Sequence, residues 1–298
     1  AGTVDVLFGN GTTTNTFGSK VSYPHNLSAG AIQAADFNND TKADIVVFGT
    51  HGPDDLALFI NNGNGTFAAA VEFSYGTNNG SGPWNNDMRL SDFDGDGKKD
   101  LVINDKNLNR LYILKNNGNS TFTVTDTLLT GANPNSLAVG DLNNDGRDEI
   151  AVAYGYGTAS NDSVSFFMNN GNGLFGNRTS LFILSFAVNQ REIAIAKLDA
   201  GNSGDLIVHQ ATELGIYLNN GSQVFTAQPT VFVGATSTEI IVNDFNTDNK
   251  KDIVVTDYDG NRVCVALGNG NGTFQSYIAY SANGKYDHAV YADFVNDT

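Results

Sequence analysis

Short apolar runs recur along the chain, and polar segments rich in glycine and asparagine separate them. Residues 135–184 show the pattern clearly, with four strand-like runs: "NSLAVGD", "EIAVAYG", "VSFFMNN" and "LFGNRTSLFIL". Asn-Gly and Asp-Gly pairs between such runs supply the positive φ angles that tight hairpin turns require. No segment places apolar residues at the i, i+3, i+4, i+7 spacing of an amphipathic helix. The pattern therefore predicts an all-β protein of short strands.

An acidic segment of nine residues returns along the chain. The intact copies read "DFNNDTKAD", "DFDGDGKKD", "DLNNDGRDE" and "DFNTDNKKD" and begin at Asp36, Asp92, Asp141 and Asp244. A degraded copy, "KLDAGNSGD", begins at Lys197, and an incomplete one, "DFVND", begins at Asp293. The spacing of 47–56 residues between copies indicates a repeat architecture.

A second motif keeps step with the first. It reads "INNGNGTF", "KNNGNSTF", "MNNGNGLF", "LNNGSQVF" and "LGNGNGTF", ending at Phe67, Phe122, Phe175, Phe225 and Phe274. Each unit then holds four strands, with the acidic loop between strands one and two and the Asn-Gly turn between three and four. Four-stranded units arranged around a ring form a β-propeller. Chain length divided by the period predicts about six blades in one domain, residues 1–298, with repeats at 1–28, 29–82, 83–132, 133–188, 189–235, 236–284 and a partial 285–298.

The paired motifs resemble FG-GAP repeats, also called VCBS repeats, as found in the integrin α-subunit head and in secreted adhesion and lectin-like proteins. The resemblance covers nearly the whole chain. It implies a β-propeller with calcium-binding loops between strands one and two. Propellers of this family commonly have seven blades, so seven is possible here if the chain is a fragment.

The acidic loops fit a divalent cation. Carboxylates about 4 Å apart near a protein surface repel by about 4 kcal/mol, and a shared counterion removes that cost. Hard oxygen ligands in a flexible loop suit calcium better than magnesium. Carried over position by position from the family's loops, positions one, three, five and nine supply the ligands of about four calcium ions: Asp36, Asn38, Asp40, Asp44; Asp92, Asp94, Asp96, Asp100; Asp141, Asn143, Asp145, Glu149; and Asp244, Asn246, Asp248, Asp252.

The acidic loops have two other interpretations. An EF-hand needs a glutamate at position twelve, where the intact copies have an apolar strand residue, so it is rejected. Solvated turns capped by Asp and Asn are the simpler alternative, but such turns do not explain the acid repeated at position nine. In the degraded copy, Lys197 replaces the first acid, and we expect its ammonium to pair with Asp199 or Asp205 in place of a metal. The incomplete last copy is also expected to hold no metal.

The opposite face of the disc should carry the variable loops, which fall at 49–55, 74–87, 155–163 and 281–288. Variable loops on a rigid scaffold are where binding specificity is usually built. The candidate ligand residues on this face are Trp84, Tyr75, His51, Tyr156 and His288. An aromatic platform among polar side chains suits a sugar. The alternative is that Trp84 packs between two blades.

The net charge of −16 argues against nucleic acid or anionic membranes as partners. One cysteine, Cys264, excludes an internal disulfide framework, and at its expected buried position it is inert. No zinc-like histidine spacing, phosphate loop or nucleophile elbow is present, so we expect no enzyme activity. Asn-x-Ser/Thr sequons, as at Asn64 and Asn271, allow glycosylation of a secreted chain.

The closing blade is incomplete in the sequence, because the two ends supply strands three, four and one but no strand two. A fragment of a longer chain, a lost or disordered strand, or a strand donated by another molecule would each explain this. The sequence thus favours a secreted, calcium-binding, non-catalytic propeller that mediates adhesion or recognises an extracellular glycan or protein. The alternatives are an ancillary or catalytic propeller of a polysaccharide-degrading protein and a structural subunit of an extracellular filament.

Overall fold

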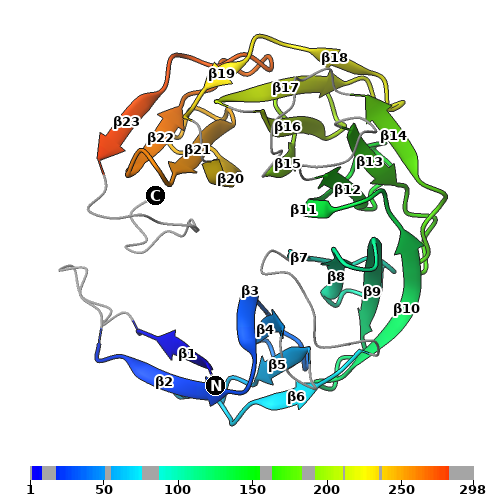
Figure 1. The fold of residues 1–298 in the computed structure, drawn as a ribbon, viewed down its shortest axis with the longest axis vertical. Coiled ribbons are helices and arrows are strands. Elements are labelled where there is room, and N and C mark those ends of the chain that lie inside the picture. Colours follow the sequence, from blue (N-terminus) through cyan, green and yellow to red (C-terminus); the bar gives the residue numbers. More distant parts are fainter. Residues whose placement is uncertain are drawn as a thin grey trace.

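The computed structural model describes residues 2–8, 18–50, 55–75, 87–154, 163–182, 192–210, 212–234 and 237–281. The strands in these segments form antiparallel sheets whose chain order matches their spatial order. The sheets stand around a common axis like the blades of a propeller (Figure 1). The all-β propeller with four-stranded blades is thus confirmed. None of the described residues forms a helix with the length and apolar character of a membrane span.

Five blades are present in the described part of the chain. Blade one contains β3 (Ser28–Ala35), β4 (Asp44–Thr50), β5 (Leu56–Phe59) and β6 (Val71–Phe73). Blade two contains β7 (Met88–Ser91), β8 (Asp100–Asp105), β9 (Arg110–Asn116) and β10 (Phe122–Leu129). Blade three contains β11 (Pro134–Gly140), β12 (Glu149–Tyr154), β13 (Ser163–Phe167) and β14 (Thr179–Phe182).

Blade four contains β15 (Ile193–Ala196), β16 (Asp205–Gln210) and β17 (Glu213–Asn219), and its outer position is shared by β18 (Phe225–Ala227) and β19 (Val231–Phe232), which both pair with β17. Blade five contains β20 (Ser237–Asn243), β21 (Asp252–Asp257), β22 (Arg262–Ala266) and β23 (Ile278–Ser281).

The prediction of about six blades is wrong for the described structure, which shows five. The sixth position holds only a two-stranded sheet, β1 (Gly2–Val6) paired with β2 (Val21–His25). Dividing length by period overcounted because it credits residues at both ends as a full unit, whereas a blade requires four paired strands. Residues 282–298, which include the incomplete acidic copy, lie outside the described residues.

The core lies between neighbouring blades. Each of the five apolar clusters joins residues of two adjacent sheets; one contains Val102 and Ile113 of blade two with Leu137 and Ile150 of blade three. The second strand of a blade is covered on both faces, so its sequence is a continuous apolar run, and every residue of β12 is buried. The fourth strand lies at the rim, and all of β23 is exposed.

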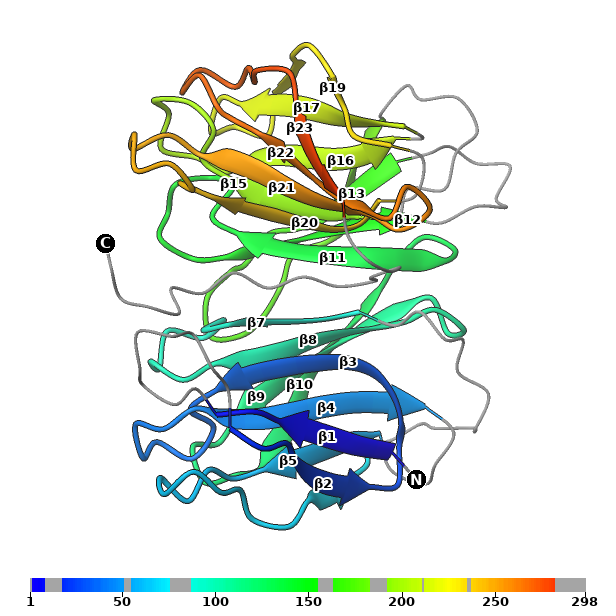
Figure 2. The same ribbon diagram turned by 90° about the vertical axis from the view of Figure 1, so that its left-hand side faces the viewer.

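The inner strands run in one direction. Figure 2 shows the arrowheads of β3, β11 and β20 pointing the same way, so the loops that follow these strands lie on one face of the ring. Those loops are the acidic segments, because each joins strand one to strand two. Strand two of each blade ends, and strand one of the next blade begins, on the opposite face.

Candidate metal centre

The acid at position nine is buried beneath each acidic loop. In blade two, Asp100 is 1% exposed; its Oδ2 accepts the backbone N–H of Phe93 (3.0 Å) and its Oδ1 accepts that of Asn116 (2.8 Å). The carboxylate thereby ties the acidic loop to the start of the Asn-Gly turn. The same pair of bonds recurs in the other blades, at Asp44, Glu149, Asp205 and Asp252.

This geometry gives the ninth acid a structural reason to repeat that needs no metal, since a buried backbone N–H left without an acceptor is costly. The repetition of that acid therefore does not by itself distinguish calcium loops from metal-free turns. Only the other positions of the loop can distinguish a cation site from a metal-free turn.

Burial changes the acidity of the ninth acid. It raises the pKa of Asp100 to about 6 and that of Glu149 to about 7, against the opposing effect of the two N–H donors. Nearby carboxylates such as Asp94 and Asp145 raise these pKa values further. Burial also raises the pKa of Asp44 and of Asp205. A cation bound in the loop would favour the ionised form of these groups.

The acid at position one folds the loop around itself. Asp92 accepts the backbone N–H groups of Gly95 (2.8 Å), Asp96 (3.0 Å) and Gly97 (2.8 Å). The backbone at positions four and six has positive φ, at 77° for Gly95 and 86° for Gly97. The other intact loops have the same conformation, mostly with non-glycine residues, including threonines at 41 and 247 with φ of 69° and 62°. Positive φ is unusual for a β-branched residue.

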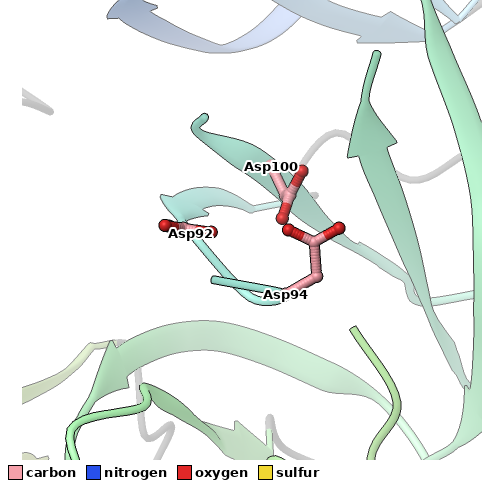
Figure 3. Close-up of side chains that lie close together, drawn as sticks. All are labelled: Asp92, Asp94 and Asp100. Atoms are coloured by element: carbon pink, nitrogen blue, oxygen red, sulfur yellow. The ribbon is translucent and has the colours of Figure 1, made fainter. Parts of the chain in front are cut away.

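Three acids of blade two converge. Asp92, Asp94 and Asp100 each bring one carboxylate oxygen to within 4.8 Å of the other two. In Figure 3 the carboxylates of Asp94 and Asp100 point toward each other, with Asp92 across the loop. Calcium binds oxygen at about 2.3–2.6 Å, so ligands on opposite sides of one ion lie about 5 Å apart. The spacing of these oxygens therefore fits a calcium ion.

We number each acidic loop by its blade. Loops one, three and five have asparagine at position three, and its side-chain oxygen accepts the backbone N–H of position five. The N···O distances are 2.9 Å for Asn38, 2.9 Å for Asn143 and 3.0 Å for Asn246. Asp94 of loop two makes the same bond to Asp96, at 3.1 Å. An amide oxygen is also a ligand for calcium. The four intact loops therefore share one arrangement, with the densest charge in loop two.

A basic residue at position seven pairs with the acid at position five, a relationship that the sequence reasoning missed. The pairs are Lys42–Asp40 at 2.8 Å, Lys98–Asp96 at 2.7 Å, Arg147–Asp145 at 2.6 Å and Lys250–Asp248 at 3.2 Å. All four intact copies have Lys or Arg at this position, and the degraded copy has Ser203, so the repeat itself carried the signal. The exposed side chains make each pair weak in water.

Loop two has an additional cation. The Nζ of Lys115, next to Asn116 in β9, contacts Asp94 and lies 2.9 Å from Oδ2 of Asp96. Hydrogen bonds to Asp94 and Asp96 raise the pKa of Lys115. Desolvation would raise the pKa of Asp96, but the hydrogen bonds from Lys98 and Lys115 outweigh it and lower that pKa. A metal ion at this loop would share Asp94 with Lys115.

In the degraded loop, the expected substitution of an ammonium for the metal is not seen. Lys197 makes no ion pair with Asp199 or Asp205 in the described residues. Asp205 is instead held by the backbone N–H groups of Leu198 and Asn219, each at 2.8 Å. Lys197 is exposed and therefore does not need a carboxylate partner.

The acidic loops also join neighbouring blades. The carbonyl oxygen of Phe93 in loop two accepts the N–H of Gly173 (3.2 Å) and the side-chain N–H of Asn169 (3.0 Å), both from the Asn-Gly turn of blade three. The ring of Phe93 meets that of Phe175 edge-on, with centroids 5.4 Å apart. Phe37 and Phe122 make the same contact between blades one and two, at 5.5 Å. Ordering an acidic loop therefore also orders the contact to the next blade.

Of the candidate ligand-face residues, only Tyr75 falls within the described segments; Trp84, His51, Tyr156 and His288 lie outside them. The ring of Tyr75 packs between blades one and two, with its centroid 5.0 Å from that of Tyr112 and 6.4 Å from that of Phe48. Burial raises the pKa of its hydroxyl. Tyr75 is thus part of the packing between these two blades. Cys264 is 1% exposed, as expected for an inert thiol.

Comparisons with known proteins agree with the repeat and the fold. The FG-GAP-like repeat family matches residues 43–103 and 92–152. A comparison with curated protein sequences finds no match. Similar solved structures include an Agrocybe aegerita lectin that recognises non-reducing terminal N-acetylglucosamine, with a TM-score of 0.67 and 21% identity over 94% of this chain and 74% of the lectin chain.

Two further structures are similar. A putative 6-phosphogluconolactonase from Bacteroides uniformis has a TM-score of 0.64 and 14% identity, over 94% of this chain and 79% of that one. The BBS1N chain crystallised in complex with ARL6DN has a TM-score of 0.62 and 14% identity, over 95% of this chain and 82% of that one. At these identities the likeness concerns the fold alone. The chain is therefore a β-propeller that carries FG-GAP-like repeats.

Proposed function

We propose that this FG-GAP-repeat propeller is a calcium-stabilised, non-catalytic domain that acts outside the cell and recognises a glycan or protein on the face opposite the acidic loops. The convergence of Asp92, Asp94 and Asp100 supports the calcium part of the proposal most directly. Calcium would neutralise three carboxylates that otherwise repel one another within one loop. It would also stiffen the loop on which the next blade docks.

Calcium binding is tested by titration calorimetry and by thermal melting in calcium and in chelator. We expect calcium to raise the melting temperature and to bind at about four sites, with the affinity in the ~0.1–1 mM range typical of extracellular modules. Asp94→Ala should lower the number of bound ions by one. The matched control is Asp199→Ala, which changes the same position in the degraded loop and should leave the stoichiometry unchanged.

No heat of binding and identical melting curves with and without chelator would mean that the loops are metal-free turns. In that case the hydrogen bonds of the first and ninth acids alone would hold the loops. The recognition part of the proposal could still stand, because it concerns the opposite face.

Recognition of a glycan is supported by the sequence of the variable segments, which combine aromatic and polar residues, Trp84 above all. A lectin among the similar structures indicates that this fold can present a sugar site. The test is binding to a glycan array, with the expectation that Trp84→Ala abolishes binding. Phe232→Ala, which removes a 48% exposed aromatic from the outer strand β19, is the control.

Binding that survives Trp84→Ala, or an array without any signal, would contradict a sugar site at this residue. The same face would then be tested for binding of a protein partner. Measurable turnover of a polysaccharide would contradict a non-catalytic role. Both assays use the purified chain with calcium present, so that one preparation serves for all outcomes.

A further inference from the structure

Charged side chains from several blades meet at the inner strands of the ring. Arg89 of β7 donates from Nη1 to Oδ1 of Asp87 at 2.5 Å, and its Nη2 lies 3.7 Å from Oε2 of Glu192, which directly precedes β15. Ser136 of β11 donates from Oγ to Oε2 of Glu192 at 2.8 Å and lies 3.4 Å from Oδ2 of Asp87. Blades two, three and four are thereby linked at β7, β11 and β15, the strands that lie nearest the axis of the ring (Figure 1).

The two carboxyl groups have unequal partners. Asp87 accepts the backbone N–H groups of Met88 and Leu137, each at 2.8 Å, in addition to the Arg89 guanidinium. Within the described part of the chain, the carboxyl group of Glu192 accepts one hydrogen bond, from the hydroxyl of Ser136. The guanidinium of Arg89 lies farther from it, at 3.7 Å. N–H donors stabilise a carboxylate. The negative charge therefore belongs on Asp87, and a proton shared by the pair belongs on Glu192.

Two further titratable residues, Glu239 and His209, lie near Glu192. Glu239 of β20 adds a third negative charge to the field of the cluster. His209 of β16 donates its backbone N–H to the carbonyl oxygen of Glu192 at 3.0 Å, and its ring Nε2 lies 3.5 Å from the carbonyl oxygen of Gly234. Three carboxyl groups thus surround one guanidinium, and Glu192 is only 8% exposed.

We propose that protonation of Glu192 controls the link between blades two, three and four, which we call the Glu192 latch. The latch is closed when the carboxyl group is protonated. It opens when the group ionises, because the two carboxylates of Glu192 and Asp87 then repel each other. Burial raises the pKa of Glu192 well above its ordinary value, and the charges of Asp87 and Glu239 raise it further, against the opposing effect of Arg89. Because Asp87 and Glu192 directly precede the inner strands β7 and β15, the latch lies on the face opposite the acidic loops.

The direction of the pH effect follows from linkage. A carboxyl group whose pKa is higher in the folded than in the unfolded protein contributes its full stability below the unfolded-state value. That contribution is lost as the pH rises through the folded-state pKa. The latch therefore weakens the ring toward alkaline pH, unlike an ordinary salt-bridged carboxylate, which loses its contribution in acid.

The test compares melting temperatures from about pH 5 to about pH 9, at saturating calcium, for the wild type, Glu192→Gln, Glu239→Gln and the control Glu213→Gln of β17. The wild type and the control should lose several degrees as the pH rises. Glu192→Gln should lose that decline and be the more stable protein at the alkaline end. Glu239→Gln should move the decline to lower pH, because removal of one negative charge lowers the pKa of Glu192.

A second measurement detects the proton directly. At saturating calcium and neutral pH, the infrared carbonyl band of neutral carboxyl groups should be stronger in the wild type than in Glu192→Gln, and this difference between the two proteins should vanish at alkaline pH. Parallel melting profiles of wild type and Glu192→Gln, or no difference between their carboxyl bands at neutral pH, would overturn the latch. The infrared result decides the matter even if a variant is destabilised for another reason.

Discussion

Asp205 accepts the backbone N–H of Asn219 at 2.8 Å in the blade whose acidic loop has lost the acids of positions one and five. The same carboxylate holds Leu198 at 2.8 Å. The buried link between the two repeated motifs thus persists where the metal-ligand pattern does not. It follows that the ninth acid holds the blade together whether or not the loop retains its other acids.

This separation predicts the effect of removing the ninth acid from the degraded loop. Asp205→Ala leaves two backbone N–H groups without an acceptor, which should lower the free energy of unfolding by about 2–4 kcal/mol. Asp205→Asn keeps one acceptor oxygen and should cost less. Denaturant unfolding measures both, and the loss should be the same in calcium and in chelator. A loss that appears only with calcium would mean that Asp205 is a metal ligand.

The contact of Lys115 with Asp94 predicts competition between the ammonium and calcium at loop two. Lys115→Met removes the competing charge and keeps the apolar stem, so the calcium affinity of that loop should rise several-fold, as expected for the loss of one nearby like charge. Titration calorimetry at low salt measures the change. Lys250→Met, in loop five, removes a lysine that contacts a single acid and should have the smaller effect. Equal calcium affinities of the wild type, Lys115→Met and Lys250→Met would show that the Lys115 side chain points away from a bound ion.

The raised pKa values of Asp100 and Glu149 predict opposite pH trends with and without metal. In chelator, the protonated carboxyl groups favour the folded state, so this contribution to stability is full below pH ~4 and is lost as the pH rises through about 6 and about 7. Calcium requires the ionised groups, so its affinity should increase over the same range. Melting curves in chelator and calcium titrations at several pH values check both trends.

Glu149→Gln separates the loop from the Glu192 latch in this experiment. The variant should lack the part of the decline that occurs near pH 7 in loop three, and it should bind calcium more weakly. If the calcium affinity of the wild type does not change between pH ~5 and ~8, the buried ninth acids are not ligands of the ion.

The positive φ of Thr247, 62°, predicts a stabilising substitution. Position four of loop two holds Gly95 at φ 77°, with no heavy atom near the place where a Cβ would stand. Thr247→Gly should therefore relieve backbone strain and raise the free energy of unfolding by up to about 1 kcal/mol, after the greater entropy loss of glycine. Urea unfolding measures it; Thr256→Gly, in the buried strand β21, is the contrasting substitution and should destabilise. No gain at Thr247 would show that the loop tolerates threonine without strain.

The repeat, the four-strand unit and the position of the acidic loops were predictable from the sequence. These features rest on local chemistry: Asn-Gly turns, apolar runs and acids at alternate positions act within one unit of about fifty residues. The candidate ligands at positions one and three were predictable for the same reason, since Asp92 and Asp94 belong to one turn. The repeated four-stranded unit itself predicted a propeller, which the fold bears out.

The tertiary structure alone decided the features that depend on residues far apart in the chain. The number of complete blades follows from which strands find partners. The role of Asp205 follows from its bond to Asn219, 14 residues away, and the packing of Tyr75 from its contact with Tyr112. The cluster at the axis joins Asp87 to Leu137 and Ser136 to Glu192 across 50 and 56 residues. No local pattern reports such contacts, because they exist only once the blades have closed around the axis.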